Sequence, residues 1–281
     1  MKKLILPAML AFVTTMTAAQ SIGKYLETRL GVVSYTHRRS FQKDVAATLD
    51  TIKALGFTNI EISNLFGKTA AEFRKLLDER GIRCTSFGVG YPDLVNKTDE
   101  VGNNAKTLGA SFVRVAWIPH EGSFTIETAK QAVADFNAAG KTLKEKYGLS
   151  FCYHNHGYEF QPYEKGTYFD FIAANTNPAY VNFEIDILWA FFPGADPAAL
   201  IRKHGNRMKL MHVKDLRKGV KGDFSGKTDG NNDVAVGTGQ IDIPAVMKAA
   251  KKAGVIYYYI EDESDHVGVQ VPQSLAYLKK L

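Results

Sequence analysis

Histidines and carboxylates recur in this sequence where short apolar segments end. Six of the seven histidines fall at or just past such a segment, and two of the six lie in the run YHNHGYEF at 153–160. Asp186, His212 and Glu261 stand at or near the ends of three later segments of the same kind. Carboxylate oxygens and imidazole nitrogens suit manganese, cobalt, zinc or magnesium, and the absence of thiolates argues against a structural zinc. The pattern therefore predicts one divalent metal ion bound by Asp186, His212 and Glu261, against the alternative of three hydrogen-bonded core residues.

The run at 153–160 offers two candidates for a fourth metal ligand. Glu159 lies just beyond the predicted strand and can reach back, so we take it as the ligand, with His154 as the alternative. His154 and His156 are then predicted to move protons or orient the substrate. Lys214 follows His212 closely and is predicted to neutralise negative charge that develops beside the metal, unless it is an ordinary loop lysine.

Other strand ends carry candidates for substrate binding. Trp117 and Trp189 follow the fourth and sixth predicted strands, and flat aromatic faces bind sugar rings well, although core packing is the competing interpretation. Glu61, on the second predicted strand, and His120, after the fourth, carry polar groups that can hydrogen-bond sugar hydroxyls.

These residues must be positioned by a repeated unit. Runs rich in β-branched and aromatic residues alternate with longer amphipathic segments, which is typical of βα repeats. Strands are predicted near 30–35, 58–63, 82–88, 112–117, 149–154, 181–186, 208–213 and 256–261. Helices between them include 45–55, 70–80, 99–108, 126–146, 168–175, 197–204 and 243–253. Several helices close on a glycine directly before the next strand, which fits a C-cap.

The number of strands favours a closed barrel over an open doubly wound sheet, and no G-x-G-x-x-G motif follows the first strand. We therefore predict a single-domain α/β protein, a (β/α)8 TIM barrel of typical length. Residues two apart in a strand share a face, so Glu61, Asp186, His212 and Glu261 are all predicted to point into the lumen near its mouth.

The N-terminal segment has the pattern of a signal peptide. Two lysines precede an apolar stretch at 4–13 that is too short to span a bilayer, and small residues at 17–19 offer a cleavage site. We predict a signal peptide at 1–19, a barrel at 20–281, and a periplasmic or secreted protein without stable membrane insertion. No cysteine lies near the predicted cleavage site, which leaves no residue for lipid attachment.

The remaining bulk features constrain the partners. The formal charge is +6, but lysines and arginines are mixed with acidic residues in helix-like segments, so a solvated surface is favoured over nucleic-acid binding. Cys84 and Cys152 lie in separate predicted strands and are predicted to be buried free thiols. The glycine-rich loop 217–239 has the length of an active-site lid, with a disordered connector as the alternative. A homo-oligomer is compatible with the sequence.

Five motifs, YHNHGYEF, FEIDILWA, MHVKDLRKG, GTGQIDIP and YYYIEDES, together resemble the sugar phosphate isomerase/epimerase family, the xylose isomerase-like barrels that also include endonuclease IV. The resemblance covers essentially the whole predicted mature chain. It implies one divalent metal held by Glu, Asp, His and Glu at the ends of the fifth to eighth strands. The matching positions are Asp186, His212 and Glu261, with Glu159 or His154 in the first place. Ketose epimerases of this family use a glutamate there as half of a proton shuttle, and His154 departs from that pattern.

We accordingly expect a metal-dependent isomerase or epimerase that acts on a sugar or keto-sugar through an enediolate stabilised by the metal. The histidine at 154 also suits a lyase or hydrolase that cleaves 3-keto-glycosides. Two other classes are a non-catalytic carbohydrate-binding barrel and an endonuclease-IV-like DNA repair enzyme, for which an exported chain has no substrate. The expected partner is a small carbohydrate.

Overall fold

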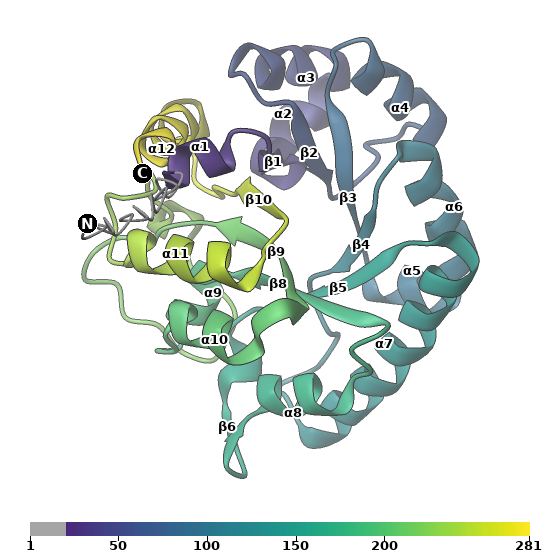
Figure 1. Ribbon diagram of the computed structural model, residues 1–281, viewed down its shortest axis with the longest axis vertical. Coiled ribbons are helices and arrows are strands. Elements are labelled where there is room, and N and C mark those ends of the chain that lie inside the picture. Colours follow the sequence, from purple (N-terminus) through teal and green to yellow (C-terminus); the bar gives the residue numbers. More distant parts are fainter. Residues whose placement is uncertain (1–20) are drawn as a thin grey trace, which may run out of the picture.

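The computed structural model describes residues 21–281, and the predicted signal peptide lies outside them. Eight parallel strands close into a barrel in the order β1-β10-β9-β8-β5-β4-β3-β2, and helices surround it (Figure 1). The barrel strands are β1 (Leu30–Val33), β2 (Asn59–Ile62), β3 (Arg83–Val89), β4 (Phe112–Val115), β5 (Ser150–His154), β8 (Val181–Asp186), β9 (Met208–Val213) and β10 (Tyr257–Ile260). The predicted (β/α)8 barrel is confirmed.

The helices include all those expected from the sequence. They are α1 (Ile22–Leu26), α2 (Arg38–Lys43), α3 (Val45–Ala54), α4 (Ala70–Asp78), α5 (Tyr91–Asn96), α6 (Thr98–Leu108), α7 (Ile126–Tyr147), α8 (Tyr168–Asn175), α9 (Ile187–Phe191), α10 (Pro197–His204), α11 (Ile243–Ala253) and α12 (Val267–Lys280). Short 3₁₀ turns η1 (Ser34–His37), η2 (Tyr158–Phe160), η3 (Gly205–Arg207) and η4 (Gly230–Asn232) lie in the connections. A two-stranded hairpin, β6 (Pro162–Tyr163) and β7 (Gly166–Thr167), follows β5.

Local sequence explains where the helices begin and end. Thr69 and Thr167 form capping boxes with Glu72 and Asp170, so that each pair satisfies backbone N–H groups at a helix start. The five glycines predicted to separate helix from strand all have positive φ, which is costly for other residues: Gly56, Gly81, Gly109, Gly148 and Gly254. A glycine in the left-handed conformation thus ends the helix and lets the chain turn into the next strand at each of these positions.

The barrel lumen holds both apolar and polar side chains. Inside the lumen, Val33, Phe112, Cys152, Leu210 and Tyr259 form a small buried cluster. The strand register then sets His212 beside Asp186 of β8 and beside Tyr259 of β10. Since inward-facing residues alternate along each strand, polar side chains occupy the layer nearest the carboxyl ends. The larger core lies between the strands and the surrounding helices.

The loop 217–239 is folded against the barrel mouth. Leu216 and Asp233 form an isolated antiparallel bridge. The Asp215 carboxylate accepts backbone hydrogen bonds from Leu216, Gly237, Gly239 and Ile241 at 2.8–3.1 Å, so one side chain holds both ends of the loop. These contacts give the segment a defined path.

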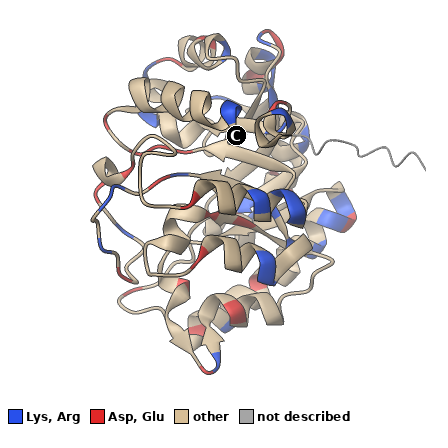
Figure 2. Cartoon of the chain, turned by 60° about the vertical axis from the view of Figure 1, so that its left-hand side comes forward, with Lys and Arg blue, Asp and Glu red and all other residues tan. Residues whose placement is uncertain are grey.

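The surface charge is mixed. On the face shown in Figure 2, Lys and Arg lie on the outer helices, with Asp and Glu interspersed and along the loops. Among residues 21–281, no helix has the length and apolar character needed to cross a bilayer. Cys84 and Cys152 are both buried free thiols, as predicted.

Candidate metal centre and active site

Four side chains meet at the carboxyl ends of neighbouring strands. They are His154 at the end of β5, Asp186 at the end of β8, His212 on β9 and Glu261 directly after β10, and all four are buried. His154 Nε2 lies 3.1 Å from His212 Nδ1 and 3.4 Å from Asp186 Oδ2. His212 Nδ1 lies 2.9 Å from Glu261 Oε2. We refer to these four residues as the ligand group.

The ligand group has the spacing and chemistry of a cation site. Four ligands bonded at ~2.1 Å in tetrahedral geometry are about 3.4 Å from one another, which matches the separations above. Asp186 Oδ1 accepts the backbone N–H of Trp189 at 2.9 Å and so caps α9, whereas its Oδ2 is buried without a hydrogen-bond partner. A buried carboxylate oxygen without a partner is costly, and a bound cation would offset that cost.

Asn155, between the two histidines of the HNH run, fixes the strand ends. Its Oδ1 accepts the backbone N–H of Asp186 at 3.0 Å, and its Nδ2 donates to the Asp186 carbonyl at 3.1 Å. This reciprocal pair holds β5 and β8 in register where their ligands project. No role for Asn155 was expected from the sequence, although an amide flanked by two histidines was the available signal.

Glu159, taken from the sequence as the fourth ligand, lies outside the ligand group. Its Oε1 accepts hydrogen bonds from the Tyr153 hydroxyl and from the backbone N–H of His156, which draws the carboxyl into the core. Burial raises its pKa to about 7, although these two donors favour the charged form. Of the two alternatives, the structure brings His154 into the group.

Glu61 lies beneath His212 and not in the wall of the cavity where the sequence placed it. Its Oε1 lies 2.9 Å from His212 Nε2, and the side chain is fully buried. Burial alone would raise the pKa of Glu61, but Arg114 and His212 hold it well below its ordinary value. Glu61, Glu184 and His212 form a second group of metal-ligand type, but Arg114 already supplies its positive charge.

Lys214 is fully buried next to the ligand group. Its Nζ lies 2.6 Å from Glu263 Oε1, 3.3 Å from Glu261 Oε2 and 3.4 Å from Asp233 Oδ2. Burial would lower the pKa of Lys214, but the surrounding carboxylates, Asp233 first, raise it well above its ordinary value. The lysine is therefore a permanent cation that fixes Glu261 and ties Asp233, from the 217–239 loop, to the barrel.

A cavity of about 440 Å³ opens above the ligand group. His154, His156 and Trp189 line it, as do Tyr35 and residues 226–228 of the long loop. The loop therefore closes one side of the cavity, in agreement with its predicted position over an active site. Tyr35 and Lys227 were not assigned from the sequence, because nothing in it shows which loop residues fold over the mouth.

Trp117 and His120 form a wall behind His156 and are not among the residues that line this cavity. Their rings stack with centroids 5.0 Å apart, and the Trp117 ring meets His156 edge-on at 5.1 Å. His120 Nδ1 lies 2.7 Å from the Ile118 carbonyl. Of the two tryptophans, Trp189 faces the cavity and Trp117 supports it.

His156 is held as a neutral imidazole. It lies between Trp117 and Trp189, with the latter ring 5.6 Å away. Burial, with a smaller contribution from His154, lowers its pKa to about 3. An uncharged histidine in the cavity wall has a free lone pair at neutral pH. A pKa of about 3 makes it a weak base, so proton abstraction by His156 requires negative charge on a bound substrate to raise that pKa.

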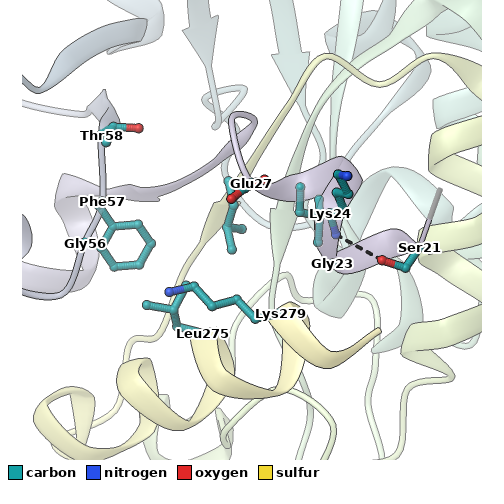
Figure 3. A pocket seen from close by; sticks show the side chains of 11 residues that line it. Ser21, Gly23, Lys24, Glu27, Gly56, Phe57, Thr58, Leu275 and Lys279 are labelled. Carbon is teal, nitrogen blue, oxygen red and sulfur yellow. Dashed lines mark hydrogen bonds between the residues drawn. The ribbon is translucent and has the colours of Figure 1, made fainter.

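A larger cavity, about 790 Å³, lies at the other end of the barrel (Figure 3). It is bordered by α1, by residues 56–58 before β2, and by Leu275 and Lys279 of α12. Within the described residues, none of the groups of potential metal ligands lies there. Since barrel enzymes carry their chemistry at the carboxyl ends of the strands, the smaller cavity is the candidate site.

A closed parallel barrel with a buried His/Asp/Glu group at its carboxyl end defines a class of proteins that carry a functional site at that end. Within this class, the chain belongs to the xylose isomerase-like TIM barrel family, whose model matches residues 49–281. The resemblance inferred from the sequence motifs is confirmed at this level.

Two curated relatives are inosose dehydratases. That of Clostridium tetani (strain Massachusetts / E88) is 36% identical over 98 residues, which are 34% of this chain and 32% of the relative. That of Geobacillus thermodenitrificans (strain NG80-2) is 29% identical over 240 residues, which are 75% of this chain and 79% of the relative. The first match thus spans about a third of its relative, and the second most of it.

Solved structures share the whole fold. A sugar phosphate isomerase/epimerase from Parabacteroides distasonis ATCC 8503 superimposes with a TM-score of 0.71 at 25% identity, covering 96% of this chain and 98% of that one. The IOLI protein, whose crystal structure contains a bound zinc atom, superimposes with a TM-score of 0.70 at 15% identity, covering 90% and 95%. At the latter identity the likeness concerns the fold alone.

Proposed function

We propose that this protein is a divalent-metal-dependent lyase that removes a β-substituent, hydroxyl or glycosidic, from a cyclic sugar or polyol that carries a ketone. The observation that carries the proposal is the ligand group of His154, Asp186, His212 and Glu261 beneath a cavity walled by the neutral His156. The ligand group would hold the ion, and an ion bound there supplies Lewis-acid stabilisation of negative charge on a substrate oxygen.

The chain's own residues can complete an elimination. His156 accepts the proton from the carbon next to the ketone, and the electron pair moves toward the ketone oxygen. The β C–O bond then breaks, and protonated His156 returns the same proton to the departing oxygen. One base on one face is sufficient for this syn elimination, and proton, leaving group and charge balance without an added reactant.

Other residues of the site would hold the ligand group in place, contact the substrate and restrict the entry of water. Lys214 stays protonated and holds Glu261 in the ligand group, since its Nζ is 3.3 Å from Glu261 Oε2. Trp189 lines the cavity next to His156, where it can contact a bound sugar ring. Residues 226–228 cover the mouth and restrict water entry.

Two observations favour elimination over epimerisation. Epimerisation by proton transfer on opposite faces commonly needs a pair of bases, but position 154 carries a histidine that lies within the ligand group. The relatives matched over 75% and 34% of this chain are named inosose dehydratases. A dehydratase of a ring ketone performs the class of step described above.

An isomerase or epimerase is the second candidate. The likeness that favours it is to the sugar phosphate isomerase/epimerase of Parabacteroides distasonis, at 25% identity over nearly the full length. In that case the proton taken by His156 would be returned to carbon.

The test is incubation of the zinc-, manganese- or cobalt-loaded protein with inososes, keto-sugars and 3-keto-glycosides in D₂O, followed by NMR and by enone absorbance. A new enone with release of water or an alcohol supports the lyase. Deuterium at carbon without release supports the isomerase, and sugar binding unaffected by a chelator, with no turnover, supports a carbohydrate-binding barrel. His156→Gln should retain the metal but lose turnover at least ~100-fold.

We also propose that the protein is exported, because the sequence pattern at 1–19 has the form of a cleavable signal. N-terminal sequencing of protein recovered outside the cytoplasm should begin at Gln20. Recovery of cytoplasmic protein that begins at Met1 would contradict it.

A further inference from the structure

His212 is the one residue of the ligand group whose two ring nitrogens both face carboxylates. Its Nδ1 faces the other ligands, at 2.9 Å from Glu261 Oε2 and 3.1 Å from His154 Nε2. Its Nε2 points the other way, toward Glu61 Oε1 at 2.9 Å. Because a neutral imidazole carries one proton, the partner of Nε2 decides which nitrogen is free to bind an ion.

Glu61 is itself held in place by Arg114. The guanidinium donates to Glu61 Oε1 from Nε at 3.0 Å and from Nη2 at 2.5 Å. Arg114 fits there because β3 carries Gly88 alongside it. A Cβ at Gly88 would stand 2.8 Å from Arg114 Nη2 and force the guanidinium away. The carboxylate position is thus set by three strands, β2, β3 and β4.

We infer that Glu61 is a positioning residue for the metal centre: it accepts the Nε2–H of His212 and so leaves the Nδ1 lone pair directed at the other ligands. This inference rests on the proposed metal-dependent function. Carboxylates that accept a hydrogen bond from a ligating histidine fix the tautomer and ring orientation, and their loss typically weakens metal binding by about 10–100-fold. Glu61 does not line the cavity, so it acts through His212.

Glu184 provides a matched comparison on the neighbouring strand β8. It is as buried as Glu61, and its Oε2 lies 3.4 Å from the same His212 Nε2 and 3.2 Å from Arg114 Nε. It makes no hydrogen bond to His212 among the described contacts. Burial is therefore similar at the two glutamates. Their pKa values differ, because Arg114 and His212 hold that of Glu61 well below its ordinary value despite burial, whereas burial and the neighbouring Glu61 raise that of Glu184 well above it. The hydrogen bond to His212 is the contact that Glu61 makes and Glu184 lacks.

The experiment compares Glu61→Gln and Glu184→Gln in the full-length protein, with Zn²⁺ or Co²⁺ alone as the probe. Affinity is measured by chelator competition, and the Co²⁺ absorption spectrum reports ligand geometry. We expect Glu61→Gln to bind about 10–100-fold more weakly with an altered Co²⁺ spectrum, and Glu184→Gln to stay within about threefold of wild type. Equal losses in the two variants would show that the hydrogen bond to His212, which Glu184 lacks, is not responsible, and would overturn the inference.

A second measurement does not depend on either glutamate variant folding. Histidine ¹⁵N NMR of the Zn²⁺-loaded wild type, assigned with His212→Gln, identifies which nitrogen of His212 carries the proton. A proton on Nε2 is expected, and a proton on Nδ1 with metal on Nε2 would overturn the positioning role. A wild type that binds neither ion contradicts the proposed function itself, which keeps the two failures distinct.

Discussion

Asp186→Asn should separate two roles of one side chain. The Asp186 Oδ1 caps α9 through the backbone N–H of Trp189, and an asparagine oxygen can accept the same hydrogen bond. The Oδ2 belongs to the ligand group and has no hydrogen-bond partner. The substitution therefore keeps the cap and replaces the ligand oxygen with an amide NH₂.

The substitution should weaken metal binding but raise the free energy of unfolding of the metal-free protein. Four-ligand zinc sites bind with roughly 10–16 kcal/mol, so one ligand accounts for about 3 kcal/mol, or ~100-fold in affinity. Without metal, burial raises the pKa of Asp186, which means that its charge is unfavourable in the folded state. Removing that charge should raise the free energy of unfolding of the metal-free protein, and therefore its Tm.

The assay is thermal unfolding of wild type and variant in excess chelator and in excess Zn²⁺. Asp196→Asn is the matched control, because Asp196 caps α10 through Ala199 N–H at 3.1 Å and is exposed and remote from the ligand group. It should change Tm little in either condition, since Asn and Asp cap similarly. An Asp186→Asn protein that keeps the full Zn²⁺-dependent rise in Tm would refute the ligand assignment.

Three other predictions concern residues around the site. The pKa of Glu159 in the folded protein is about 7, above its ordinary value of 4.5. Between these two pH values the folded protein retains a proton that the unfolded chain releases. The free energy of unfolding therefore falls as pH rises from about 4.5 to 7. Glu159→Gln should remove on the order of 3 kcal/mol of this loss, measured by urea unfolding across that window; parallel pH profiles for both proteins would contradict it. Lys214→Met should destabilise the metal-free protein by about 3–5 kcal/mol, because it leaves buried carboxylates uncompensated, and an unchanged urea midpoint would argue against that network. Gly239→Ala places a Cβ 2.2 Å from Asp215 Oδ1 and should make the 217–239 loop more sensitive to trypsin than in wild type, with equal cleavage rates as the contrary result.

The fold followed closely from the sequence because its signals are local. The predicted strand at 208–213 is β9 residue for residue, and the predicted helix at 168–175 is α8. Periodicity and glycine C-caps act within a few residues of the elements they define. The hairpin β6–β7 was missed because its strands have two residues each, too short for any alternation.

The site was predicted less completely because sequence parity gives a face and not a depth. Glu61 shares the inward face with Ser63, but lies one inward position deeper, ~6.6 Å along the strand. It therefore reaches His212 and not the cavity. Glu159 was placed by proximity in sequence to a strand end, and its carboxyl instead follows the Tyr153 hydroxyl into the core. Arg114 gave no signal, since an arginine in a strand is ordinarily a surface residue.

The two buried thiols allow opening of the barrel to be measured by chemical labelling. Cys152 lies inside the lumen, and Cys84 lies in the main core. Burial raises the pKa of both, so neither presents a reactive thiolate in the closed barrel. A small thiol reagent would modify Cys152 only when the strands part, and Cys84 only when the helices move away from the strands. The labelling rates at Cys152 and Cys84 would thus distinguish breathing of the lumen from separation of the helices around it, without an introduced probe.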